Sequence, residues 1–215
     1  MSMSDVAPAL IGIGGVAVGG SIQWMAATKA QRTQYLVAFA QKREAYYARL
    51  LLSVDRLALA HGKDADQCKA GFLAQLHGKA AGEDAAITYT RSQATMDSIK
   101  AATDEWRDVL GDRYLNAGDP VADTMSRLDR ARESLVQLCN QGRLLDALAY
   151  HDGEFGRSIR RVKLAVGFAG AQGAAMVLRE TSHWWNRKLR SASNKAVSDA
   201  LKRLQEFESQ TVEEA

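Results

Sequence analysis

Side chains that could bind a metal ion gather in two short stretches of this 215-residue chain. Metal sites place their ligands at defined spacings, such as paired C-x-x-C or H-E-x-x-H on one helix face, and neither stretch has such a spacing. Both stretches lie beside a glycine, in what we interpret as polar loops, so we predict no metal site at either. The residues are His61, Asp64, Asp66 and Cys68 in the first stretch, and His151, Asp152 and Glu154 in the second.

Motifs for other chemistry are missing from the sequence or lack the required context. We find no G-x-S-x-G, no phosphate loop with GK[ST] and no Cys and His at an informative spacing. Gly12, Gly14 and Ala17 match a dinucleotide-binding turn, but no acidic residue follows about 20 positions on, and no strand–helix alternation follows. We therefore predict no catalytic residues, no cofactor and no enzymatic activity.

A second kind of chemistry, binding to anionic surfaces, is indicated by a cluster of aromatic and basic residues near the C-terminus. Aromatic faces beside cations suit an anionic membrane or a single-stranded nucleic acid. Nucleic acid is disfavoured because the net charge is only +3 and no pattern of a base-stacking sheet accompanies the cluster. The alternative is that the tryptophans lie in a helical core beside solvated arginines. The predicted patch is Trp184, Trp185, Arg187, Lys188 and Arg190, with His183 beside it.

The element that would position such a patch is an N-terminal membrane anchor. Residues 6–27 form an uncharged run of 22 residues. As a helix this run would be about 33 Å long, which matches a hydrocarbon core of about 30 Å. It is rich in alanine and glycine, and it contains Pro8, Ser21 and Gln23. The alternative is therefore a glycine-rich helix in the core of a soluble protein.

The charges that flank this run predict its orientation. Asp5 precedes the run, whereas the first bases, Lys29 and Arg32, follow it. A cleaved signal peptide would have bases before the apolar segment, so we favour an uncleaved anchor. Because the more basic flank stays in the cytoplasm, we predict a single-pass protein of the cell membrane with its N-terminus outside and its bulk in the cytoplasm.

Small residues in the anchor indicate how it could associate with itself. Gly15 and Gly19 make a G-x-x-x-G step with Gly12 nearby, which lets two membrane helices approach closely. Trp24 falls where an indole ring would lie in the headgroup layer. The three glycines predict a homodimer through the anchor, with Trp24 as an anchor residue at the interface; the alternative is that small residues are simply common in this segment.

The remainder of the chain has a strongly helical pattern. It contains few of the residues that break helices, with two prolines in the whole chain and no glycine or proline in residues 22–61. We predict an all-α protein in which a single-pass helix continues into an elongated helical bundle. The predicted units are an anchor at residues 1–28, a bundle at 29–209 and an acidic tail at 210–215.

Hydrophobic periodicity places the helices of this bundle. One helix extends from residue 21 to His61, and Gly62 is expected to end it. Later helices are expected at residues 62–83 (short), 84–110, 119–142, 144–150, from 154 onward, and 193–208. Residues 164–178 are uncharged but too short to span a bilayer, so we expect a core helix there or, as the alternative, a segment in contact with the membrane.

The two cysteines, Cys68 and Cys139, are far apart in the sequence and have no partner at C-x-x-C spacing. This usage is typical of a reducing compartment. We expect both to be free thiols, mostly buried.

The segment Lys42–Leu51, which reads KREAYYARLL, follows the glycine-rich run and a basic linker. With the stretch from Gly118 to Leu128, it resembles a group of small uncharacterised bacterial proteins from high-GC genomes. Their pattern is an N-terminal membrane helix, a long helix of the R-E-A-Y type and further helices. The resemblance implies this architecture and no activity.

These patterns together predict a membrane-tethered helical interaction or scaffold protein. Its expected partners are membrane lipid, a second copy of the chain and a protein that the sequence does not identify. The alternative is a soluble helical protein that binds anionic membrane, and less plausibly nucleic acid, through its basic C-terminal helix.

Overall fold

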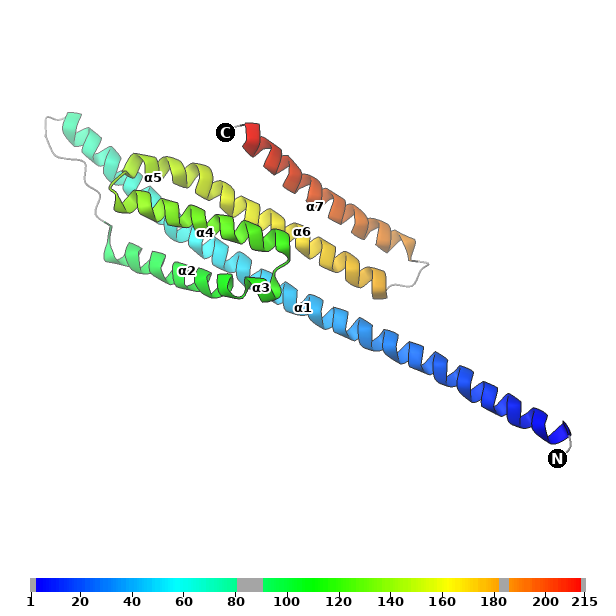
Figure 1. Cartoon of the computed structure of the whole chain (residues 1–215). Helices are drawn as coiled ribbons and strands as arrows, with labels where there is room; N and C mark the ends of the chain where they lie inside the picture. Colours follow the sequence, from blue (N-terminus) through cyan, green and yellow to red (C-terminus); the bar gives the residue numbers. More distant parts are fainter. Residues whose placement is uncertain (1–2, 81–90, 182–185, 214–215) are drawn as a thin grey trace.

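In the computed structural model, the chain is an elongated bundle arranged along one long helix, α1 (Met3–Ala80) (Figure 1). The structure describes residues 3–80, 91–181 and 186–213, with side chains described from residue 27 except at 75, 76, 78–80 and 211–213. Each regular element in these ranges is a helix, which confirms the predicted all-α class.

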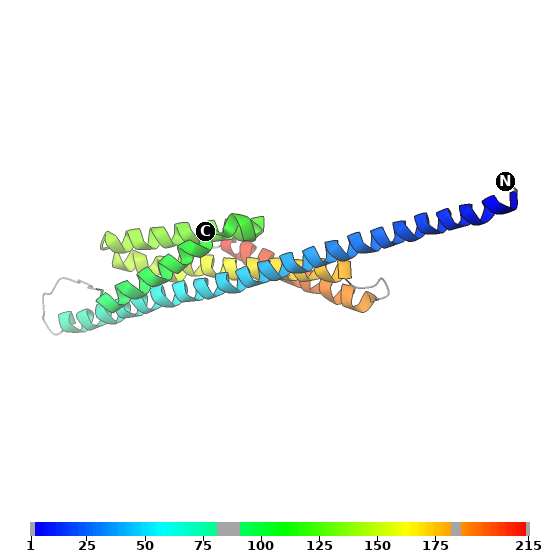
Figure 2. The same ribbon diagram turned by 90° about the horizontal axis from the view of Figure 1, so that it is seen from below.

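The other helices pack beside the C-terminal part of α1, and the N-terminal part of α1 extends past them (Figures 1 and 2). Helices α2 and α6 pack on α1, α4 packs on α6, and α7 lies along α6. The elements are α2 (Gln93–Gly111), α3 (Arg113–Asn116), α4 (Asp119–Asn140), α5 (Leu144–Tyr150), the π-helical turn η1 (His151–Phe155), α6 (Gly156–Thr181) and α7 (Arg187–Glu213).

The spacing of apolar residues in α1 predicts one buried stripe, made of Leu36, Phe39, Tyr46, Leu50, Val54 and Leu57. The last four are buried and form one wall of the core, whereas Leu36 is half-buried and Phe39 is exposed. The prediction that Gly62 ends this helix is wrong, because α1 continues to Ala80. A glycine inside a helix costs only about 1 kcal/mol, and buried side chains on both sides of Gly62 outweigh that cost.

Most other helix ends follow their predicted signals. Helix α4 begins at Asp119 with Pro120 in its first turn, and after its end Gly142 turns the chain with φ of +71°, a conformation that glycine adopts readily. Helix α2 begins at Gln93 rather than near residue 84, because Ser92 caps it by accepting the backbone N–H of Thr95 at 3.2 Å. Helix α7 begins before the predicted position, at residue 187.

The helices differ in packing between the two ends of the bundle. We call residues 46–68 of α1, together with α2, α4, α5, η1 and α6 up to residue 169, the distal half. Its centre is Trp106, which is fully buried and donates its indole N–H to Asp129 Oδ1 at 3.0 Å. Beside it, the Tyr46 hydroxyl donates to the Val109 carbonyl at 3.0 Å. The distal half is a well-packed, hydrogen-bonded core.

We call residues 27–45 of α1, residues 170–181 of α6 and residues 187–201 of α7 the proximal half. None of its described side chains is buried. Helix α7 contacts the rest of the bundle mainly through α6, and Arg161 lies over the Phe207 ring of α7 at 5.8 Å from its centroid. The uncharged block at 164–178 is therefore divided, with its start in the core and its end at the surface.

Candidate functional site

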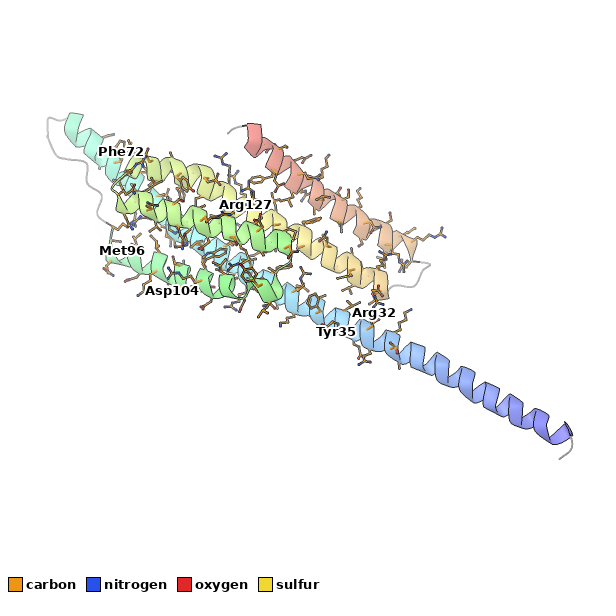
Figure 3. The ribbon with its side chains drawn as sticks, viewed as in Figure 1. Arg32, Tyr35, Phe72, Met96, Asp104 and Arg127 are labelled. Carbon is orange, nitrogen blue, oxygen red and sulfur yellow. The ribbon has the colours of Figure 1, made fainter. Side chains whose placement is uncertain are left out.

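The proximal end of the bundle joins two segments that lie far apart in the sequence. The Arg32 guanidinium of α1 lies 3.8 Å from the Glu180 carboxylate near the end of α6. Arg32 and Tyr35 mark the point where α1 leaves the bundle (Figure 3), and each is 71% exposed. The end of α6 and the start of α7 lie at this same end (Figures 1 and 2).

The predicted anionic-surface patch belongs to this end. Arg187 and Lys188 are exposed in the first turn of α7. Arg190 is half-buried and donates to the Arg179 carbonyl of α6 at 3.3 Å. His183, Trp184 and Trp185 lie outside the described residues. The structure therefore places the cations of the patch beside the exit of α1.

Charge is distributed unevenly between the two ends. Residues 27–35 and 177–190 contain six bases and a single carboxylate, Glu180. At the opposite end, residues 62–70, 91–97 and 143–154 contain four bases and six carboxylates. The proximal end is therefore the more attractive to anions.

The predicted anchor lies outside the described side chains. This applies to Gly12, Gly15, Gly19 and Trp24, so their self-association stays a prediction. Among the residues whose side chains the structure describes, from residue 27 onward, no helical stretch is both long and apolar enough to cross a bilayer.

At the distal end, the structure brings together residues that the sequence separates. A cavity of about 320 Å³ lies among α1, α2, α4, α5 and η1. Four of its polar lining residues belong to the two His/Asp/Cys stretches that stand out in the sequence. The sequence did not indicate that Arg91 and Cys139 would also line the cavity, because they come from other elements. Its polar lining residues are His61, Asp64, Cys68, Arg91, Cys139 and His151.

One wall of the cavity is η1, a wide turn that joins α5 to α6 without a break. The Phe155 ring of η1 contacts the His61 ring edge to face, with centroids 5.1 Å apart, and lies 5.7 Å from the His151 ring. Single π-helical turns inside longer helices occur frequently at functional sites. Here the turn holds an imidazole at the cavity wall.

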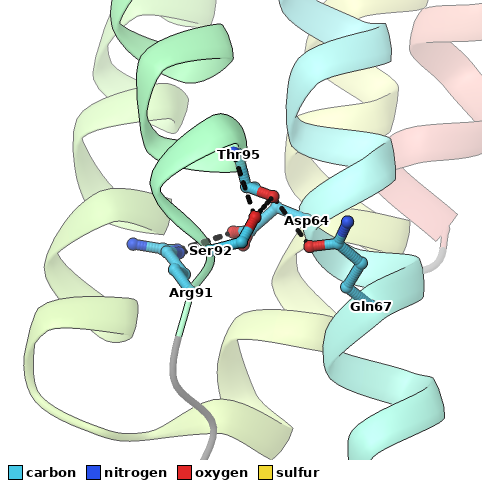
Figure 4. Close-up of polar contacts among 5 residues, drawn as sticks. All are labelled: Asp64, Gln67, Arg91, Ser92 and Thr95. Atoms are coloured by element: carbon cyan, nitrogen blue, oxygen red, sulfur yellow. Dashed lines mark hydrogen bonds and ion pairs between the residues drawn. The ribbon is translucent and has the colours of Figure 1, made fainter.

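An ion pair closes another wall (Figure 4). Arg91 donates Nε to Asp64 Oδ1 at 2.9 Å and Nη2 to Asp64 Oδ2 at 2.6 Å, a two-point contact that favours the pair. Next to it, the Thr95 hydroxyl donates to Gln67 Oε1 at 2.8 Å. These bonds attach the start of α2 to α1.

Burial favours the neutral forms of three other groups in the cavity, His61, Cys68 and Cys139. It lowers the pKa of His61 to about 4, so this imidazole is uncharged at pH 7. Burial also raises the pKa of the Cys68 and Cys139 thiols. Both cysteines are free, as predicted, with Cys68 buried and Cys139 half-buried. At neutral pH these groups supply neither a thiolate nor an imidazolium for catalysis.

The two stretches considered as metal ligands are only partly brought together. His61, Asp64, Cys68 and His151 line the cavity, whereas the side chains of Asp66, Asp152 and Glu154 are exposed. Asp152 accepts hydrogen bonds from His151 and Lys69, which lower its pKa. Across the described part of the chain, no group of three or more His, Cys, Asp or Glu side chains is arranged to hold an ion.

Comparison of the chain with protein-family models, with curated proteins and with solved structures gives no match. Function is therefore argued from the site alone.

Proposed function

We propose that this protein is a membrane-tethered helical interaction protein, with its N-terminal segment in the cell membrane and its bundle in the cytoplasm. One observation carries the proposal. Arg32, which follows the uncharged run by five positions, lies 3.8 Å from Glu180 at the basic proximal end.

The distances support this arrangement. Residue 27, the last of the uncharged run, precedes Arg32 by five positions, or about 7.5 Å along a helix. That is within the Debye length of about 8 Å at physiological ionic strength. A bundle tethered at residue 27 would hold the Arg187 and Lys188 side chains close to an anionic leaflet, where each base contributes about 1 kcal/mol of attraction.

The tether has a mechanical consequence. Since α1 is one continuous helix, the bundle would be joined to the membrane without a flexible linker. The exposed faces of the bundle would then be presented to protein partners at a fixed height. Close approach of two anchors at Gly12, Gly15 and Gly19 would give a homodimer.

Membrane extraction of the full-length chain tests the proposal. We expect retention after washes with high salt and with carbonate, and release after Val16→Asp with Val18→Asp, because charges in the bilayer core are costly. An N-terminal tag should be accessible to protease from outside the cell. Recovery of the unaltered chain in the soluble fraction would contradict the proposal.

The second candidate function is peripheral binding of a soluble protein to anionic membrane, and it is favoured by the basic start of α7. Under that function, salt alone should release the chain, and Arg187→Glu with Lys188→Glu should abolish binding. Under the leading proposal, the same variant stays bound after carbonate. Lys202→Glu with Arg203→Glu, farther along α7, is the matched control for charge. Trp184→Ala with Trp185→Ala tests the aromatic part of the patch.

A further inference from the structure

Three glycines of α6, Gly167, Gly170 and Gly173, are not explained by packing within the chain, and the last two line the same groove. A Cβ atom added at Gly170 or Gly173 would meet no atom within 4 Å. Glycine is a poor helix former, so a helix interior retains it mainly where something must approach closely. Within the described residues nothing approaches these two positions, so they leave a hollow open at the surface.

That hollow is an apolar groove of about 620 Å³ between α1 and α6. Its wall on α1 extends from Val37 to Leu51, a length of about 21 Å along the helix. Its wall on α6 includes Val166, Met176 and Leu178. The dimensions and the apolar walls match one extended long-chain acyl group.

A second hollow, of about 900 Å³, adjoins the groove between α6 and α7. The two share Arg43, Gly173, Met176 and Leu178, so they form one continuous surface. Arg43, Arg179 and Arg190 all line the second hollow, and Glu44 is the single carboxylate among the described residues that line either one. The apolar groove therefore continues into a hollow that is lined by three arginines.

Two of the three arginines, Arg43 and Arg190, are held in place by contacts within the chain. The Arg43 guanidinium lies over the rings of Phe39 and Tyr47, at 5.6 and 5.4 Å from their centroids, and donates to the Tyr47 hydroxyl at 2.6 Å. Arg190 donates to the Arg179 carbonyl, which ties the start of α7 to α6. Guanidinium groups bind carboxylates and phosphates through paired N–H donors.

We propose that this surface binds a long-chain fatty acid, with its carboxylate among Arg43, Arg179 and Arg190 and its acyl chain in the groove between α1 and α6. Charge complementarity selects an anionic amphiphile over an uncharged one. The groove of about 620 Å³ has room for one extended acyl chain, which favours a single-chain lipid. The proposed membrane attachment supplies the source of the lipid, and the inference rests on the proposed function in that respect alone.

Photo-crosslinking with a diazirine derivative of palmitate tests the proposal. The full-length chain is reconstituted in phosphatidylcholine vesicles, and crosslinks are mapped by mass spectrometry of the digested protein. We expect crosslinks within residues 37–51 and 166–178, competed by unlabelled palmitate. Crosslinks spread evenly along the chain, or confined to residues 6–27, would overturn the proposal.

Filling the groove is the sharper test. Gly170→Leu with Gly173→Leu places two side chains in the hollow without a clash at Cβ, and should reduce the crosslinks at least tenfold. Gly167→Leu is the matched control, because Gly167 is on the same helix with equally open space but does not line the groove. Circular dichroism is used to check that both variants are folded. Equal labelling of the two would overturn the site.

Two further experiments test whether the arginines bind the carboxylate and whether a second copy of the chain occupies the groove instead. Arg179→Gln with Arg190→Gln should reduce labelling by the palmitate probe about tenfold and leave labelling by the matching alcohol probe unchanged. Protein–protein crosslinks through α6, with no lipid label, would assign the groove to a second copy and overturn the proposal. Carbonate extraction of the same samples tests the tether independently, since labelling of a chain that carbonate releases would refute the tether and retain the lipid site.

Discussion

The two halves of the bundle differ in how deeply their side chains are buried. In the distal half, Trp106, Phe155 and Leu57 are fully buried, and the Trp106 indole N–H donates to Asp129, although the buried Ser53 and Ser158 hydroxyls make no hydrogen bond among the described residues. In the proximal half, none of the described side chains is buried, and α6 presents glycine and alanine beside arginine. The difference indicates that the distal half stabilises the fold and that the proximal half is shaped for contacts outside the chain.

The largest expected effect is on the core of the distal half. Trp106→Ala should lower the free energy of unfolding by about 4 kcal/mol, because it removes a fully buried ring and leaves a cavity. Trp106→Phe keeps most of the volume and should cost about 1 kcal/mol for the lost bond to Asp129. Urea denaturation followed by circular dichroism measures both values.

The proximal half supplies the matching control for this prediction. Leu178→Ala, at a half-buried position of the groove, should cost less than about 1 kcal/mol. A loss as large as that of Trp106→Ala would show that the two halves are equally well packed and would remove the basis of the comparison.

A second effect concerns the pH dependence of the distal half. His61 has a folded-state pKa of about 4 against 6.5 in a model compound, so the unfolded chain binds more protons between these pH values. Stability from His61 is therefore full above about pH 6.5 and is lost as the pH falls toward 4. By linkage, the free energy of unfolding at pH 5 should be lower by about 2 kcal/mol than at pH 8 on account of this group.

The variant His61→Gln isolates this contribution from that of other groups, because it cannot titrate in this range. Urea denaturation at pH 8 and at pH 5 should give a smaller change for the variant than for the unaltered chain, by about 2 kcal/mol. Identical changes in the two proteins would mean that His61 reaches solvent and titrates normally.

The smallest expected effect is a rise in the free energy of unfolding, on substitution of a glycine in the proximal half. Gly170→Ala should raise the free energy of unfolding by about 1 kcal/mol, because alanine favours the helix and its Cβ meets open space. At Gly142, where the added Cβ also meets no atom, alanine should instead cost about 1 kcal/mol, since φ is +71°. Thermal unfolding of both variants compares the two signs.

Much of the fold follows from local signals in the sequence. The apolar stripe of α1 is correctly predicted to be buried at Tyr46, Leu50, Val54 and Leu57, although not at Phe39, and the helix expected from residue 119 begins at Asp119. Gly62 misleads, because its cost as a helix interruption is smaller than the stabilisation from the buried side chains of His61, Asp64 and Cys68 around it. A local signal fails where burial by distant elements outweighs it.

The candidate sites are predicted less completely, for the same reason. The cations Arg187 and Lys188 stand out in the sequence, and so does the uncharged block at 164–178. The arrangement that brings them together does not stand out, because the groove and the adjoining hollow are lined by α1, α6 and α7 together. Arg43 lines both from a position about 140 residues before α6 ends. Likewise, the ion pair between Asp64 of α1 and Arg91, just before α2, could not be predicted from the sequence.

The sequence by itself determined the helical class, the faces that are buried and the uneven distribution of charge, because these depend on residue type and on spacing within one element. The tertiary structure alone decided which faces meet, where α1 leaves the bundle and which arginines share a hollow. Those features depend on contacts between residues far apart in the chain, and such contacts leave no periodic pattern in any one segment.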